Sequence, residues 1–260
     1  MYFIDSHCHL HDDRIYRDIP NIIARSETAG VQYMVTCATM ENNFKQTAGL
    51  AREYRSVLPC FGIHPWFVGN LSEDWQQTLE MFLTSHRSGI GETGLDFMDK
   101  NADQDLQLRV FSHHLNLSNE LERPINIHIR KAWDAFIHLL KKIGPLKKPG
   151  LIHSYSGSAD MIPLFEKYNL YISFSGSVTR TNARKVIKSL ETVSRNRILL
   201  ETDAPDIYPS LPNPVTNKFN EPENLPFIAE IAAKRANIGF EELANHAYHN
   251  GLTVFNPLLP

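Results

Sequence analysis

The stretch Tyr2-Phe3-Ile4-Asp5-Ser6-His7-Cys8-His9 decides between two fold classes. It opens on an apolar run, and residues 2–7 predict a first strand. A doubly wound open sheet usually continues from its first strand into a glycine-rich turn that binds phosphate. His7-Cys8-His9 stands where that turn would lie, so the sequence favours a closed parallel barrel over the open sheet.

Strand-like and helix-like stretches alternate along the rest of the chain. Leu106, Val110 and Phe111, for example, mark one face of a helix. This alternation predicts βαβ units, and about eight units in roughly 250 residues is the size of a (β/α)8 TIM barrel, an α/β fold. The predicted strands are 2–7, 31–37, 57–63, 89–91, 125–129, 151–153, 170–174 and 198–202. The predicted helices are 21–29, 73–86, 103–121, 132–142 and 183–194.

The composition is that of a globular protein. Of the 260 residues, 42% are hydrophobic and no linker or repeat divides them, so we expect a single barrel domain over 1–260. The 26 basic and 29 acidic residues give a net charge of −3, which argues against binding to nucleic acid by bulk positive charge alone. The spacing of the three cysteines fits a reduced compartment, and no apolar run approaches the roughly 18 residues of a membrane span. We expect a cytoplasmic monomer or weak oligomer that does not bind membranes.

Several predicted strands end on a side chain that binds metals or anions. Alternate residues of a strand face the same side, so His7 and His9 point together while Cys8 points away. The carboxyl ends of barrel strands meet at one rim, where barrel enzymes place their chemistry. Because unpaired buried charge is very costly, one shared site is favoured over separate structural roles. The side chains at the later strand ends are His64, Glu92, His128 with Arg130 two residues on, His153 and Asp203.

Four histidines and two carboxylates of this group form a mixed nitrogen and oxygen ligand set. They are too many for one four-coordinate structural zinc and about right for two divalent ions with open positions. A carboxylate is the natural bridge, since it can give one oxygen to each ion. Zn, Mn or Mg are compatible with these donors, and the imidazole content favours Zn or Mn over Mg.

Six motifs in order give the sequence a resemblance to the TatD family of metal-dependent hydrolases, within the amidohydrolase-like barrels. The motifs are Ile4-Asp5-Ser6-His7-Cys8-His9-Leu10, Gly62-Ile63-His64-Pro65, Gly91-Glu92-Thr93-Gly94-Leu95-Asp96, Ile127-His128-Ile129-Arg130, His153-Ser154-Tyr155-Ser156-Gly157 and Leu200-Glu201-Thr202-Asp203-Ala204-Pro205. The resemblance implies a (β/α)8 barrel that hydrolyses phosphodiester bonds, typically in DNA, as a metal-dependent nuclease (DNase). It implies two metal ions, with Glu92 as the bridge. The implied ligands are His7, His9, Glu92, His128, His153 and Asp203.

The chain also departs from the family pattern. The usual Gly-Ile-His-Pro-His becomes Gly62-Ile63-His64-Pro65-Trp66, so an indole replaces a histidine that could approach the substrate. The position after Leu10, often acidic in the family, is His11. The familiar Asn-Ala-Arg is reduced to Asn250-Gly251-Leu252. These departures place the chain in a divergent branch and bear on nuclease activity more than on metal binding.

The predicted mechanism is attack by a water shared between two ions, which loses a proton near neutral pH. Asp203 is expected to bind one ion and to accept the proton, because a carboxylate at the end of the last strand would face that water. Glu201 has the same strand parity and lies beneath Asp203 or serves as a hydrogen-bonded core group. Arg130 and His64 are expected to bind phosphate oxygens, with a solvated or structural salt bridge as the alternative role of Arg130. The substrate is then nucleic acid or another phosphodiester.

Three alternatives remain open at this point. Phosphoesterases of the polymerase-and-histidinol-phosphatase type also begin with closely spaced histidines, but the Glu92 and Asp203 motifs fit them poorly. A one-metal deaminase, or another amidohydrolase-type enzyme acting on esters or amides, shares the paired histidines and the final aspartate. Metal stoichiometry separates the deaminase from a two-metal enzyme. A non-catalytic metal-binding barrel is the third alternative, and the substitution at Trp66 keeps it open.

Overall fold

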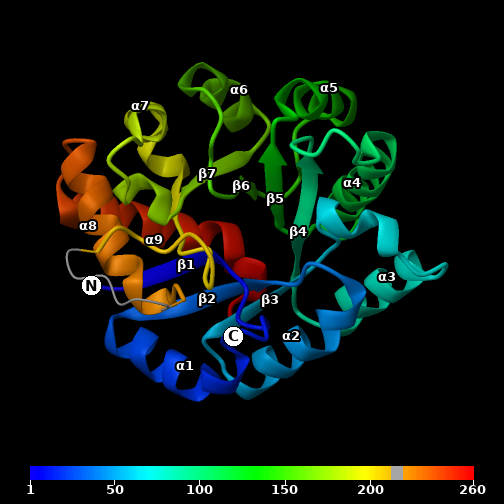
Figure 1. The fold of residues 1–260 in the computed structure, drawn as a ribbon, viewed down its shortest axis with the longest axis horizontal. Coiled ribbons are helices and arrows are strands. Elements are labelled where there is room, and N and C mark those ends of the chain that lie inside the picture. Colours follow the sequence, from blue (N-terminus) through cyan, green and yellow to red (C-terminus); the bar gives the residue numbers. More distant parts are fainter. Residues whose placement is uncertain (212–218) are drawn as a thin grey trace.

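The structure is a computed structural model that describes residues 1–211 and 219–260. At its centre, eight parallel strands follow one another in space in the same order as in the sequence (Figure 1). The strands are β1 (Phe3–Cys8), β2 (Val31–Cys37), β3 (Val57–Phe61), β4 (Gly89–Asp96), β5 (Ile125–Arg130), β6 (Gly150–Ile152), β7 (Leu170–Phe174) and β8 (Ile198–Leu200).

Hydrogen bonds join the first strand to the segment that follows the last one. The N–H of His9 donates to the carbonyl of Ala204 at 2.7 Å. Further into the barrel, the Asp5 carboxylate accepts from the N–H of Thr202 at 2.9 Å and also from the Thr202 hydroxyl. These contacts nearly close the sheet on itself, so the predicted (β/α)8 barrel is confirmed over the doubly wound sheet.

Helices surround the barrel (Figure 1). The five predicted helices are present with ends shifted by a few residues, and α2, α6, α8 and α9 lie outside the predicted ranges. In the part of the chain that the structure describes, no helix combines the length and the apolar character needed to cross a membrane. The helices are α1 (Ile19–Thr28), α2 (Glu41–Glu53), α3 (Trp75–Ser85), α4 (Gln104–Glu120), α5 (Trp133–Ile143), α6 (Ile162–Lys167), α7 (Arg184–Thr192), α8 (Leu225–Arg235) and α9 (Phe240–Phe255).

The buried apolar side chains form two clusters. The larger cluster packs the outer faces of the strands against the helices. In the smaller cluster, Leu58 and Tyr171 of the strands pack with Phe255 of α9. Asn250 of α9 donates to the carbonyl of Ile198, the first residue of β8, at 2.8 Å. Helix α9 therefore covers the amino end of the strands, and the carboxyl rim remains for polar side chains.

Strand β4 is longer than predicted. It extends over Gly89–Asp96 rather than 89–91, so Glu92 lies within the strand and not after it. Gly94 makes this extension possible, because its φ of 151° is one that other residues rarely adopt. A Cβ added there would lie 1.9 Å from the carbonyl oxygen of His128 in β5. Glycines usually weaken a strand, which explains why the sequence pattern predicts a shorter one.

Candidate metal centre

The carboxyl rim of the barrel brings the predicted histidines and carboxylates together. Glu92 lies at the centre of the cluster, with a side chain that is only 4% exposed. Its two oxygens face different partners. Oε2 faces the histidines of the first strand, and Oε1 faces the histidines of β5 and of the segment after β6.

On the first side, Oε2 of Glu92 lies 3.6 Å from Nε2 of His7 and 3.4 Å from Nε2 of His9. Oδ1 of Asp203 approaches the same two nitrogens at 3.5 and 3.4 Å. The two nitrogens are themselves 3.1 Å apart. Cys8, between these histidines, points away and donates its thiol hydrogen to the carbonyl of Val35.

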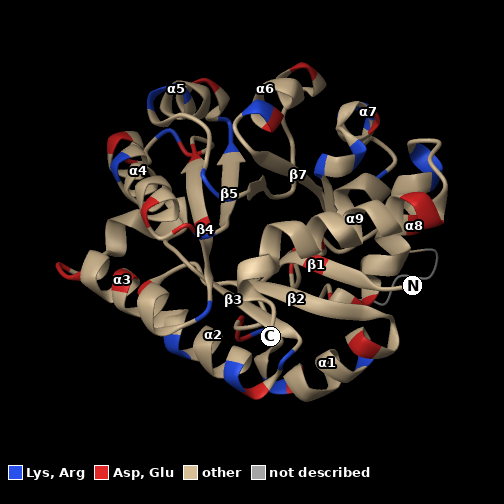
Figure 2. Ribbon diagram, turned by 180° about the vertical axis from the view of Figure 1, so that it is seen from behind, with Lys and Arg blue, Asp and Glu red and all other residues tan. Residues whose placement is uncertain are grey.

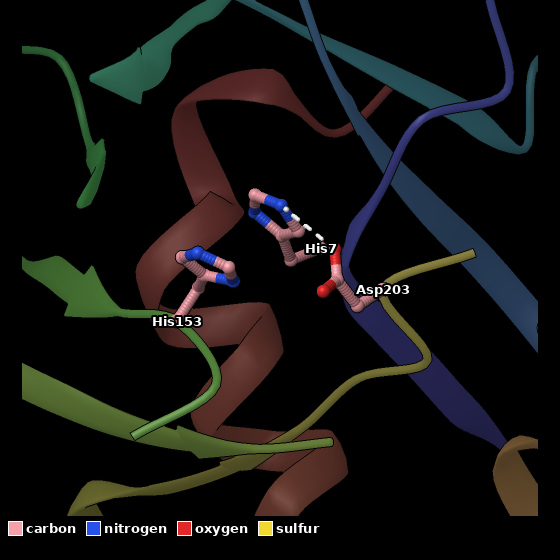
Figure 3. Close-up of side chains that lie close together, drawn as sticks. All are labelled: His7, His153 and Asp203. Carbon is pink, nitrogen blue, oxygen red and sulfur yellow. Dashed lines mark ion pairs between the residues drawn. The ribbon is translucent and has the colours of Figure 1, made fainter. Parts of the chain in front are cut away.

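On the second side, Oε1 of Glu92 lies 3.0 Å from Nδ1 of His128 and 3.0 Å from Nε2 of His153. These two ring nitrogens are also 3.0 Å apart. The ring of His153 stacks on that of His7 with 4.0 Å between centroids, and Asp203 lies on the other side of His7 (Figure 3). The two sides therefore form one continuous cluster around Glu92.

The histidines of the first strand have their outer ring nitrogens held by acceptors. Nδ1 of His7 donates to Oδ1 of Asn126 at 2.8 Å, and Nδ1 of His9 donates to the carbonyl of Cys37 at 2.8 Å. With a hydrogen on each Nδ1, each Nε2 is the atom that can offer a lone pair to the centre of the cluster once the ring is neutral. Hydrogen bonding of this kind to the outer nitrogen is typical of metal-binding histidines.

The outer ring nitrogens of His128 and His153 also face hydrogen-bond acceptors, which here are carboxylates. Nε2 of His128 faces the Asp96 carboxylate at 3.3 Å, and Nδ1 of His153 faces the Glu201 carboxylate at 3.3 Å. Their inner nitrogens therefore point lone pairs at one another and at Glu92. Converging lone pairs and carboxylate oxygens repel unless a proton or a cation lies between them, so the donor set fits divalent metal ions.

The pKa values in the cluster reflect a balance between burial and charge. Burial favours the neutral acid, but His64, His153 and His7 overcome it and hold the pKa of Glu92 well below its usual value. Burial likewise opposes a charge on His9, yet the hydrogen bond to Asp203 and the charge of Glu92 raise its pKa to about 9. Metal binding must therefore displace histidine protons, and affinity for a metal rises with pH.

His64 contacts the cluster in a different way. Its Nδ1 accepts from the N–H of Trp66 at 3.2 Å, so Nε2, which lies 3.3 Å from Oε1 of Glu92, carries the hydrogen. Burial lowers the pKa of His64 to about 4, which keeps it neutral. Nε2 of His64 lies within 4.8 Å of possible metal-binding atoms of Glu92 and His128. Because this nitrogen carries a hydrogen, it can donate a hydrogen bond to an anion but has no lone pair for a metal ion.

Arg130 and Trp66 lie at the outer edge of the cluster. The Arg130 side chain is half exposed, and its Nη1 is 4.0 Å from the Asp96 carboxylate. Trp66 is 64% exposed, yet its Nε1 donates to Oδ2 of Asp96 at 2.8 Å. Both residues line a cavity of about 630 Å³ beside the cluster. The hydrogen bond to Asp96 thus holds the indole of Trp66 at the rim, where its ring is exposed.

Two residues of the site go beyond what the sequence predicted, and a third has a role that it left open. Asp96 and Asn126 were assigned no role, and Glu201 is the hydrogen-bonded buried group that was one of its two expected roles. Of these residues, only Asp96 could have been found from the sequence, because it comes four residues after Glu92 and therefore faces the same side of β4. This spacing is informative only when the strand is known to extend through Gly94.

The fold and this cluster define the class of amidohydrolase-like barrels. An uncharacterized amidohydrolase from Saccharomyces cerevisiae has the same fold, with a TM-score of 0.79 over 98% of this chain and 99% of that one at 16% identity. A TatD homolog from Escherichia coli, YjjV, is more similar, with a TM-score of 0.91 over 98% of both chains at 26% identity.

Sequence comparisons give the family. The model of the TatD related DNase family matches residues 4–256. The metal-dependent hydrolase YabD of Bacillus subtilis is 30% identical over 253 residues, 96% of this chain and 98% of YabD. Human deoxyribonuclease TATDN3 is 28% identical over 272 residues, 98% of this chain and 95% of TATDN3. The chain belongs to the TatD family of metal-dependent hydrolases.

Proposed function

We propose that this protein hydrolyses phosphodiester bonds in DNA at a centre of two divalent metal ions. His7, His9 and Asp203 would hold one ion, His128 and His153 would hold the other, and Glu92, with one oxygen facing each pair of histidines, would contribute to both. The division of the two Glu92 oxygens between two pairs of histidines carries this proposal. One metal ion would need only one of these oxygens and one of the pairs.

Bound divalent ions supply a polarised water and neutralise phosphate charge. Asp203 serves as the proton acceptor, because it lies at the cluster beside His7 and His9, and these neighbours keep its carboxylate ionised by holding its pKa below the usual value against the effect of burial. Neutral His64 donates from Nε2 to a phosphate oxygen, and the half-exposed guanidinium of Arg130 pairs with a second one. The naming of the human relative as a deoxyribonuclease supports DNA as the substrate.

Metal content and hydrolysis of a labelled DNA oligonucleotide test this function together. Protein loaded with Zn or Mn should hold close to two ions per chain, and Glu92→Gln should lose bound metal and about 100-fold or more in hydrolysis. Asp203→Asn should lose hydrolysis as well. Glu191→Gln on the exposed face of α7 is the matched control and should change neither quantity.

Substitution of a substrate-binding residue should change KM and leave the metal content unchanged. Arg130→Ala should raise KM about tenfold or more while metal content stays at the wild-type value, because the guanidinium contacts phosphate and not the ions. Full hydrolysis by Glu92→Gln or Asp203→Asn would overturn the proposed function. One ion per chain would favour the deaminase alternative, and a fully loaded protein that cleaves no DNA would favour a different substrate or a non-catalytic barrel.

A further inference from the structure

A second cavity, of about 660 Å³, lies at the opposite end of the barrel from the metal centre. It is formed by α2, the first residues of β3 and the end of α3, and Figures 1 and 2 both show α2 beside the C-terminal end of the chain. Val57 at the start of β3 lines the cavity, whereas His64 follows the other end of this strand. Seven residues of extended chain place the two sites about 20 Å apart.

The charged side chains around this cavity are all cations. They are Lys45 and Arg52 of α2, Arg55 and Arg87. Among the described residues that line the cavity none is acidic, and no ion pair involves any of these four cations. Arg87 donates from Nη1 to the carbonyl of Leu259, a neutral acceptor that leaves its charge unbalanced. Such a cluster of cations without an ion pair among the described residues is unexpected in a chain of net charge −3, and it provides the charge for binding an anion.

The floor of the cavity is apolar. Leu58 and Phe82 are buried beneath it, and the ring of His86 stacks on Phe82 with 5.5 Å between centroids and 10° between planes. The half-buried imidazole of His86 also lines the cavity, so a flat group can lie against apolar and ring surfaces while its charge reaches the arginines. The volume is within the range of pockets that bind small molecules.

Small residues on α2 keep the cavity open. Lys45, Ala48, Gly49 and Arg52 follow at helical spacing on the face that lines it. Gly49 is in the helix interior, where glycine is unfavourable, and a Cβ added there would meet nothing within 4 Å. Packing therefore does not require this glycine, and a large side chain at this position would extend into the cavity.

We propose that this cavity binds a small organic phosphate, with the phosphate held by Arg52, Arg55 and Arg87 and the organic part on the apolar floor. Arginine is preferred over lysine at such sites because its planar fork pairs two phosphate oxygens at once. The site is separate from the metal centre, and binding there does not depend on whether the centre hydrolyses DNA.

Calorimetric titration tests the site with deoxyadenosine monophosphate, inorganic phosphate and deoxyadenosine as probes. The titrations use EDTA-treated protein carrying Glu92→Gln, so that the metal centre does not contribute. The nucleotide should bind saturably and more tightly than either fragment. Arg52→Gln and Arg55→Gln should each weaken binding about tenfold, and Lys141→Gln on α5 should leave it unchanged.

The variant Gly49→Leu distinguishes a loss of nucleotide binding from a loss of folding. Leucine fills the cavity and favours the helix, so this variant should unfold at the same or a higher temperature and yet fail to bind the nucleotide. Gly49→Ala should retain binding. Absence of saturable binding, equal affinity for a fragment, or binding that survives the arginine substitutions or Gly49→Leu would overturn the proposal.

Discussion

His114 shows how one buried side chain connects a helix to the strand that leads to the metal centre. From α4, its Nε2 accepts the N–H of Ile63 at 3.1 Å, and its Nδ1 donates to the carbonyl of Val110 at 2.7 Å. Ile63 directly precedes His64. Burial lowers the pKa of His114 to about 4, so the ring is neutral in the folded protein at neutral pH.

This neutral ring makes stability depend on pH. An unfolded histidine has a pKa near 6.5, so between about pH 6.5 and 4 the unfolded state binds one more proton than the folded state. The free energy of unfolding should fall by about 3 kcal/mol from this residue across that window as pH decreases. His114→Gln keeps an acceptor for Ile63 but does not titrate. Thermal unfolding at pH 7.5 and 5 should show a smaller loss in this variant than in the wild type, and an equal loss would contradict the assignment.

At the scale of residues, the sequence predicts which side chains share the rim but not what orients them. The positions at or near the ends of the strands predicted from the sequence place six side chains at this rim: His7, His9, Glu92, His128, His153 and Asp203. The roles of Asn126 and Asp96 depend on which ring nitrogen of a histidine faces them. Packing between strands that are distant in sequence decides that contact, and the spacing of Asp96 from Glu92 along β4 is the one local pattern that bears on it.

Among the elements, β4 is the most constrained. It carries Glu92 and approaches β5 so closely that Gly94 lies opposite His128 in the register. A side chain at Gly94 has no space, as the 1.9 Å contact of an added Cβ with His128 shows. The position of this one glycine therefore fixes the separation of the two strands that present Glu92 and His128.

Gly94→Ala should separate these strands. We expect about 3 kcal/mol or more of lost stability, because both the backbone conformation and the contact with His128 are unfavourable to alanine. Zinc affinity should fall in the same variant, since Glu92 and His128 move relative to one another. Chemical denaturation and a zinc titration measure the two effects. Gly69→Ala, where an added Cβ meets nothing within 4 Å, should behave as wild type, and an unaffected Gly94→Ala would refute this role.

Elements with a strong local signal were the most predictable. Helix α4 was predicted over 103–121 and found over Gln104–Glu120, where Asp103 caps the first turn by accepting the N–H of Leu106 at 2.8 Å. Helix α2 was not predicted, because its sequence is mostly polar and contains Gly49. Tertiary packing of Phe44 and Leu50 stabilises it instead, and single-sequence periodicity detects such packing poorly.

For the whole molecule, the join between β1 and the segment after β8 has two roles. It closes the barrel through His9 and Ala204, and it places His7 next to Asp203. Any ion bound by both residues links the beginning of the barrel to its end. Metal binding should therefore stabilise the entire fold and not only the rim.

Removal of metal tests this coupling. A metal present at about 100 times its dissociation constant adds about 2.7 kcal/mol, which raises the unfolding temperature of a chain this size by about 5 °C. Addition of Zn or Mn to EDTA-treated protein should produce this rise in differential scanning calorimetry, and fresh EDTA should reverse it. Glu92→Gln should show little response. An unfolding temperature independent of metal in the wild type would argue against a centre that spans the join.

The join also determines when the proposed centre can form during synthesis. In the sequence, Asp203 comes 194 residues after His9. At the usual pace of a ribosome, a growing chain carries its first histidines for about 10–40 s before the last aspartate is added. A metal ion that binds during this interval can contact only those proposed ligands that have already been synthesised. A chain that terminates before β8 never acquires the rest, so tight metal retention distinguishes finished molecules from truncated ones.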